Sequence, residues 1–257
     1  MAVGLLALGF FITALLYSSV GFGGGSTYNA LLILADLPVA VVPVLALVCN
    51  ILVVAIGANR FRQVGALDFK RLWPLAIASV PAAWLGGFLH VPAWLFVGLL
   101  ALCLLIAGLL MVWPRFWRDR PPRASPPSRW VDAAWGASLG LIAGVTGIGG
   151  GIYLSPVLHF RRWGSARLIA GTSAAFILVN SLGGLGGQLA KLGIGQGTDL
   201  LAAHWPLFPA VVAGGLIGSA LGSRLIPERY LRILTGLLVL YVAVRLGLRF
   251  PDEWARR

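Results

Sequence analysis

The feature that most constrains this chain is a series of long segments without a charged residue. These segments are 1–35, 37–59, 72–114, 133–160, 168–190, 200–223 and 233–244. A helix that spans a bilayer needs about 20 mostly apolar residues. Segment 72–114 is long enough for two spans that meet at the turn His90-Val91-Pro92. The runs are continuously apolar rather than alternating, which favours helices over a β-barrel. The sequence therefore predicts an all-α polytopic membrane protein with about eight membrane segments.

The charges that remain support this interpretation. Only 11% of the residues are charged, against about 25% in soluble domains. The formal net charge of +12 would be compatible with nucleic-acid binding, but the basic residues stand in short clusters between apolar runs. We expect a lipid bilayer as the environment and no nucleic acid as a partner. Residues 1–20 lack Lys and Arg, so we expect a membrane helix of the mature protein there and not a cleaved signal peptide.

The chain contains an internal repeat. Residues 21–26 read Gly-Phe-Gly-Gly-Gly-Ser and residues 147–152 read Gly-Ile-Gly-Gly-Gly-Ile, at an offset of 126. Trp73-Pro74-Leu75 and Trp205-Pro206-Leu207 match at an offset of 132. We expect a first four-segment membrane repeat at 1–114, a cytoplasmic linker with five Arg and four Pro at 115–129, a second repeat at 130–250 and a charged tail at 251–257.

The glycine triplets Gly23-Gly24-Gly25 and Gly149-Gly150-Gly151 should interrupt their segments. Each Gly costs about 1 kcal/mol relative to Ala in a helix. As one helix, residues 1–35 would extend about 52 Å, beyond the roughly 30 Å hydrocarbon core. Each segment is then either a span plus a half-helix or a re-entrant hairpin. Paired breaks in two repeats point to a transporter's binding site, and close helix packing at glycine is the alternative explanation.

A helix that restarts after such a break presents free N–H groups and the positive end of its dipole, which suits an anion. The first restart carries Ser26, Thr27 and Asn29, and the second carries Tyr153 and Ser155. Their hydroxyl and amide groups can donate to an oxyanion, or they can cap the restarted turn.

Polar residues inside the long spans are further candidates, because such groups need partners. Asn50 lies in one span, and Thr172, Ser173 and Asn180 lie in the corresponding span of the second repeat. Thr172 and Asn180 are eight residues apart, so both can face one side of a helix. Hydrogen bonding between or within helices is the alternative role. Whether the neighbouring Cys49 contacts a substrate stays open.

The acidic residues all stand at run ends, in loops or in the tail: Asp36, Asp68, Asp119, Asp132, Asp199, Glu228, Asp252 and Glu253. Proton-coupled carriers often use a carboxylate at mid-membrane depth. An anion that leaves a negative interior gains about 2.3 kcal/mol per charge per 100 mV. We therefore hypothesise anion export driven by the membrane potential.

The duplicated Gly-x-Gly-Gly-Gly unit, Pro156 and the sequence Gly171-Thr172-Ser173 resemble the TauE/SafE sulfite exporter family, over about residues 5–248. The first repeat departs from that pattern, since Pro43 to Ala46 stands where the second repeat has Ile169 to Thr172. The resemblance implies a transporter of sulfite, sulfoacetate or other organosulfur anions in the cytoplasmic membrane of bacteria and archaea.

The predicted substrate-binding set is Gly23, Gly24, Gly25, Ser26, Thr27, Asn29, Asn50, Gly149, Gly150, Gly151, Ser155, Thr172, Ser173 and Asn180. Its ligand would be a small anion. We expect no metal site, no cofactor and no enzyme activity, because the spans carry no H-E-x-x-H motif, paired carboxylates or Ser-His pair. An uptake permease for another solute and a non-transporting scaffold remain the alternatives, and the oligomeric state stays open.

Two topologies fit the basic residues. If all eight segments span, the repeats are parallel; if both glycine segments are re-entrant, the repeats are inverted. The positive-inside rule does not separate the two arrangements, because they place 14 and 15 of the 20 basic residues in the cytoplasm. Both place 58–71 and the linker there.

Overall fold

The computed structural model describes residues 3–19, 21–113, 128–222 and 228–255, which form helices without a strand. The helices are α1 (Val3–Ser19), α2 (Gly25–Leu34), α3 (Val42–Gln63), α4 (Phe69–Phe88), α5 (Ala93–Val112), α6 (Arg129–Thr146), α7 (Gly151–Phe160), α8 (Ala166–Leu192), α9 (Ile194–Ala203), α10 (Leu207–Gly222) and α11 (Glu228–Ala255). Residues 115–127 of the predicted linker fall outside the described residues, and the predicted tail is helical as far as Ala255.

The predicted polytopic helical fold is confirmed. In the described part of the chain, four stretches are long and apolar enough to cross a membrane: Val42–Gln63, Ala93–Val112, Leu168–Leu192 and Ile233–Pro251. The pair α9 and α10, bent by 70°, makes up to a fifth. Apolar side chains face outward along the long helices, among them Leu102, Ile106 and Leu109 on α5 and Leu237, Tyr241 and Val244 on α11. Such a surface suits lipid and not water.

Both glycine segments are broken where the sequence predicts. The chain leaves helical geometry between Ser19 and Gly25, and again between Thr146 and Gly151. In the second break Gly149 and Gly150 have φ of 81° and 82°, a left-handed conformation that costs other residues energy. The first break reaches positive φ at Gly21. The two breaks therefore correspond in position but differ in backbone path.

Each break folds its segment into a hairpin. On α1 and α2, Phe10 stacks on Tyr28 with ring centroids 4.6 Å apart, while Tyr17 lies against Thr27. The paired numbers run in opposite directions, so α2 returns along α1. On α6 and α7, Asp132 and Arg161 form an ion pair, which brings the start of one helix to the end of the other. Each glycine segment thus begins and ends at the same end of the bundle, which is the geometry expected of a re-entrant hairpin.

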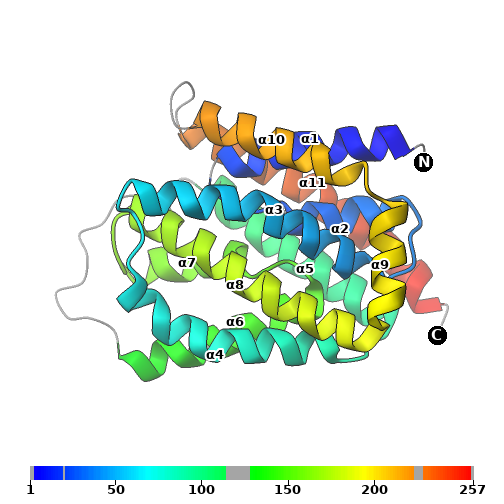
Figure 1. The fold of residues 1–257 in the computed structure, drawn as a ribbon, viewed down its shortest axis with the longest axis horizontal. Helices are drawn as coiled ribbons and strands as arrows, with labels where there is room; N and C mark the ends of the chain where they lie inside the picture. Colours follow the sequence, from blue (N-terminus) through cyan, green and yellow to red (C-terminus); the bar gives the residue numbers. More distant parts are fainter. Residues whose placement is uncertain (1–2, 20, 114–127, 223–227, 256–257) are drawn as a thin grey trace.

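Equivalent helices of the two repeats run in opposite directions. On α5 and α11, a methyl group added to Gly98 would meet Phe250, and one added to Gly108 would meet Leu240, which makes these helices antiparallel. Helices α3 and α8 also cross in opposite directions (Figure 1). Because α5 corresponds to α11 and α3 to α8, the repeats are inverted, the arrangement expected of many transporters. The sequence had left this point open.

Glycines join the two repeats through close helix contacts. On α6, methyl groups at Gly136 and Gly144 would collide with the backbone oxygens of Leu75 and Ala83 on α4. The equivalent pair, α10 and α1, has the same kind of contact at Gly214 and Gly218. Such small-residue contacts allow helix backbones to approach closely in membranes. The two helices of each pair are parallel, and each pair packs a helix of the first repeat against a helix of the second. Neither repeat is therefore a separate body.

The two ends of the bundle differ in charge. At one end, on the left in Figure 1, α3 passes into α4 and α7 into α8, and we call this the basic end. It carries Arg60, Arg62, Lys70, Arg161 and Arg162. At the opposite end α2 passes into α3, α4 into α5, and α11 finishes. The positive-inside rule assigns the basic end to the cytoplasm.

Candidate functional site

Asn50 joins the two glycine breaks near the middle of the bundle. Its Oδ1 accepts a hydrogen bond from the backbone N–H of Gly25 at 3.1 Å. Its Nδ2 donates to the backbone oxygen of Ile148 at 3.3 Å and to Ser181 Oγ at 2.9 Å. Asn50 is fully buried. One amide therefore connects the first break, the second break and α8, although these lie far apart in the sequence.

Asn29 makes a second connection between the repeats. Its Nδ2 donates to the backbone oxygens of Thr146 at 2.9 Å and Gly147 at 3.0 Å, where α6 ends. A helix end leaves carbonyl groups without intrahelical partners, and Asn29 satisfies two of them. Asn29 Oδ1 is buried without a hydrogen-bond partner.

The glycines at the breaks allow the chain segments to meet. A methyl group on Gly149 would lie 2.5 Å from Ser181 Oγ and 2.7 Å from Asn50 Nδ2. One on Gly25 would lie 2.9 Å from the backbone oxygen of Ile148, and one on Gly23 would collide with Asn50. Each of these contacts is too short for a side chain. The glycine triplets are therefore needed for packing around Asn50 as well as for the helix breaks.

Free peptide N–H groups remain at both restarted helices. In the described structure the N–H groups of Ser26 and Thr27 on α2, and of Gly151 and Ile152 on α7, donate to no protein acceptor. Such groups are expected in the first turn of a helix, and together with the helix dipole they favour negative charge. Here both sets are buried. The arrangement suits a small anion that reaches the space beside the breaks.

The hydroxyl groups of the first restart already have a partner. Tyr17 Oη lies 2.7 Å from Thr27 Oγ1 and 3.2 Å from Ser26 Oγ. Tyr17 comes from α1 and is fully buried. Sequence reasoning missed Tyr17, although a Tyr inside an apolar span needs a partner for its hydroxyl group. Ser155 is also buried, within the first turns of α7.

The candidate residues of α8 are buried, and several have unused polar atoms. Thr172 Oγ1 and Ser173 Oγ have no hydrogen-bond partner in the described structure. Asn180 Nδ2 donates to the backbone oxygen of Phe176, four residues earlier on the same helix, at 2.9 Å, and its Oδ1 is unpaired. Among the described residues, the Asn180 side chain therefore makes no hydrogen bond to another helix. Buried polar groups are usually paired, so the free hydroxyl groups are candidates for ligand contacts.

Gly24 and Gly150 face away from Asn50. A methyl group on Gly24 would lie 2.5 Å from the ring of Tyr28, and one on Gly150 would lie 3.1 Å from the ring of Phe176. These two aromatic residues pack against the breaks from outside. The structure thus brings together Asn50, Gly23, Gly25 and Gly149 directly.

A cavity of about 650 Å³ opens at the end opposite the basic end. The residues that line it are Ile33, Asp36, Leu37, Pro38, Val39, Ala40, Pro43, Leu89, His90, Val91, Ala93, Phe96, Val145, Gln188, Lys191, Leu192 and Arg249. Val145 directly precedes the end of α6, and Pro43 would contact a methyl group on Gly147. The cavity therefore reaches the start of the second break.

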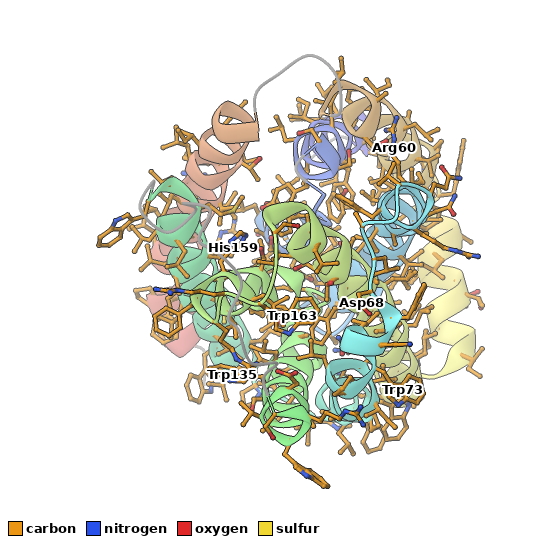
Figure 2. The ribbon with its side chains drawn as sticks, turned by 90° about the vertical axis from the view of Figure 1, so that its left-hand side faces the viewer. Arg60, Asp68, Trp73, Trp135, His159 and Trp163 are labelled. Atoms are coloured by element: carbon orange, nitrogen blue, oxygen red, sulfur yellow. The ribbon has the colours of Figure 1, made fainter. Side chains whose placement is uncertain are left out.

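At the basic end, the position that corresponds to the cavity is occupied by packed side chains around Trp163. Trp163 follows α7 as Leu37 follows α2, at the repeat offset of 126. Leu37 lines the open cavity, whereas Trp163 is 3% exposed and packs in a cluster with Leu158, Ile169 and Phe176. Figure 2 shows Trp163 near the centre of this end. The described structure thus has an open cavity at one end and a buried Trp163 at the equivalent position of the other end.

Buried charge is scarce around the breaks. Among the residues that the structure describes, Asp132 is the acidic residue with a buried side chain, and it pairs with Arg161 near the basic end. No cluster of His, Cys, Asp or Glu that suits a metal ion is present in the same residues. The groups that contact Asn50 at the two breaks are neutral.

Comparison with known proteins agrees with this architecture. The family model described as sulfite exporter TauE/SafE matches residues 5–246. A probable membrane transporter protein of Sinorhizobium fredii, y4hK, is 35% identical over 244 residues, which cover 94% of this chain and 96% of that protein. A probable membrane transporter protein of Bacillus subtilis, YjnA, is 28% identical over 267 residues, covering 96% of this chain and 100% of that protein. No solved structure gives a significant match.

Proposed function

Because this chain belongs to the TauE/SafE family of multi-pass membrane transporters, we propose that it carries a small sulfur oxyanion such as sulfite or sulfoacetate across the cytoplasmic membrane. In this proposal the anion binds beside Asn50, between the restarted helices α2 and α7. Export is the proposed direction.

The observation that carries the proposal is the set of buried, unused donors at the two breaks. The free N–H groups of α2 and α7 come from inverted repeats and lie on either side of Asn50. The hydroxyl groups of Thr172 and Ser173 on α8 are buried and unpaired, and the backbone oxygen of Ser173 lies close to Gly151 at the second break. Buried donors without a neighbouring carboxylate favour an anion over a cation or a sugar.

The membrane potential provides enough energy for export. A monovalent anion that leaves a cell gains about 2.3 kcal/mol per 100 mV, and a divalent anion gains twice that amount. This corresponds to roughly a fiftyfold concentration ratio for a monovalent anion, so export requires no coupling ion. We propose that flux follows voltage and is independent of a proton gradient.

The direct test is radiolabelled sulfite flux in proteoliposomes at a set membrane potential, with sulfoacetate, thiosulfate and sulfate as competitors. The proposal expects saturable flux that follows voltage when both sides have the same pH. Strict dependence on a proton gradient at fixed voltage would refute the driving force. No flux of these anions from folded protein would refute the substrate class, and it would favour another solute or a scaffold.

The binding site has a separate test in Thr172→Val. The Thr172 hydroxyl has no protein partner, so its removal should leave the unfolding free energy unchanged. A binding role instead predicts at least a fivefold loss of apparent affinity for the anion. Thr146→Val is the matched control, because the Thr146 hydroxyl donates to Ile142 in its own helix at 2.7 Å. Unchanged affinity in Thr172→Val would exclude this hydroxyl from the site.

A further inference from the structure

The cavity opposite the basic end contains a lysine that the transport proposal does not use. Lys191 stands in the last turn of α8, and it lines the cavity together with Gln188 one turn earlier. Its Nζ donates to the backbone oxygen of Leu89 at 3.3 Å. Its other N–H groups have no acceptor among the described residues, where no carboxylate lies within ion-pair distance of Lys191.

The other charges on the cavity wall compensate one another. Arg249 Nη1 donates to Asp36 Oδ1 at 3.0 Å and to the backbone oxygen of Ile33 at 2.7 Å. This pair ties α11 to the end of α2. The acidic residue of the wall is therefore engaged with Arg249, and Lys191 leaves the cavity with a net positive charge. Low-dielectric walls concentrate the field of such a charge and attract anions.

Gln188 provides a second feature of a binding site. Its side chain is 1% exposed, and its Nε2 donates to the backbone oxygen of Gly144 at 3.2 Å. Gln188 Oε1 is buried without a hydrogen-bond partner. A buried amide oxygen without a donor is costly, and the donor can be a water or a hydroxyl group carried by a ligand. Gly144 lies two residues before the end of α6, so Gln188 stands between the cavity and the second break.

We propose that this cavity is a second oxyanion site on the substrate's path, where Lys191 binds the anion's charge and Gln188 accepts a hydrogen from its hydroxyl group or hydration water. The proposal rests on the transport function proposed above and adds a site at the extracytoplasmic mouth. An anion that leaves the central site meets Lys191 before it reaches solvent. The site lies on the side toward which the described structure is open.

The test measures the local charge with thiol reagents of opposite sign. Ala40 lines the cavity and is exposed, so Ala40→Cys gives a reactive position there. It is built in a Cys49→Ala, Cys103→Ala background, since those are the two native cysteines. Purified protein in nanodiscs is treated with an anionic or a cationic methanethiosulfonate, and the ratio of the two rates is recorded.

We expect the anionic reagent to react faster than the cationic reagent. Lys191→Gln should lower the ratio of the anionic to the cationic rate about fivefold or more, because one nearby charge acts oppositely on the two reagents. Lys70→Gln removes an equal charge at the basic end and should leave the ratio unchanged. Sulfate or sulfoacetate should slow the anionic reagent, and this protection should weaken in Lys191→Gln and Gln188→Leu. Sulfite is avoided because it reacts with the reagent.

An equal rate for the two reagents, or a ratio that Lys191→Gln does not change, would overturn the second site. That outcome is independent of sulfite flux, which tests the transported substrate. If flux fails while protection by sulfate depends on Lys191, the cavity site stands and the transported solute is a different anion. Reaction of Ala40→Cys in intact cells with the impermeant anionic reagent further checks that the cavity faces outward; its failure would contradict the assigned mouth.

Discussion

Replacing Gly149 by Ala tests the geometry at the centre of the protein. Gly149 has a φ of 81°, and a methyl group there would lie 2.5 Å from Ser181 Oγ, 2.7 Å from Asn50 Nδ2 and 2.9 Å from Ile177 Cγ2. The left-handed conformation costs an L-residue about 1–2 kcal/mol. Overpacking of a filled interior costs about 1–3 kcal/mol. We expect Gly149→Ala to lower the unfolding free energy by about 2–5 kcal/mol.

The expected loss has a matched control in Gly57→Ala. Gly57 lies inside α3, and a methyl group there would meet nothing within 4 Å. This substitution should raise stability by about 0.5–1 kcal/mol through helix propensity. Equilibrium unfolding of both variants in mixed micelles, followed by tryptophan fluorescence, gives the difference.

Gly149→Ala should also affect transport, because the added methyl group would push the Asn50 amide away from Ile148. We expect sulfite flux at fixed potential to fall at least tenfold in Gly149→Ala and to stay unchanged in Gly57→Ala. The unfolding free energies of Gly149→Ala and Gly57→Ala could instead agree within about 0.5 kcal/mol, with the flux of Gly149→Ala unchanged. The second break would then not pack on Asn50 as described. A binding site between the two breaks would then be excluded.

Four further substitutions separate the roles of buried residues. Tyr17→Phe removes the hydroxyl group that contacts Ser26 and Thr27, and micelle unfolding should show a loss of about 1 kcal/mol; an unchanged value would contradict that contact. Asn29→Leu removes two hydrogen bonds between the repeats, whereas Asn180→Leu removes one hydrogen bond within α8. In the same assay, Asn29→Leu should therefore lower the unfolding free energy more than Asn180→Leu. Trp163→Ala should lower stability by about 3 kcal/mol and accelerate amide hydrogen exchange in α7, whereas exchange equal to that of the parent protein would argue against a packed seal.

The sequence was sufficient to predict elements that depend on local chemistry. Apolar runs predicted the helices, and the glycine triplets predicted both breaks, because three consecutive glycines disfavour a helix in any context. The same reasoning selected Asn50 as a buried polar group in need of partners. It did not predict that these partners would be Gly25, Ile148 and Ser181, since such pairings depend on how distant helices cross.

Other features required the three-dimensional arrangement. The inversion of the repeats could not be deduced from charge counts, because the two topologies differed by one basic residue. The spacing of Thr172 and Asn180 allows both to face one side of a helix, but it does not show that Asn180 donates to Phe176 within α8. The contrast between Leu37 and Trp163 is present in the printed sequence, yet its meaning depends on the cavity at one end and the packed cluster at the other.

That contrast bears on the energy difference between two access states. In an inverted repeat, the conformation open to the other side is obtained when each half adopts the shape of its counterpart. If the halves were identical, the two states would be equally populated. Here Trp163 is buried at one end, whereas Leu37 lines an open cavity at the other, so we expect the resting population to be weighted toward the state with the open cavity. Exchanging the residues at these two positions would therefore shift the balance of states while leaving every anion-binding residue in place.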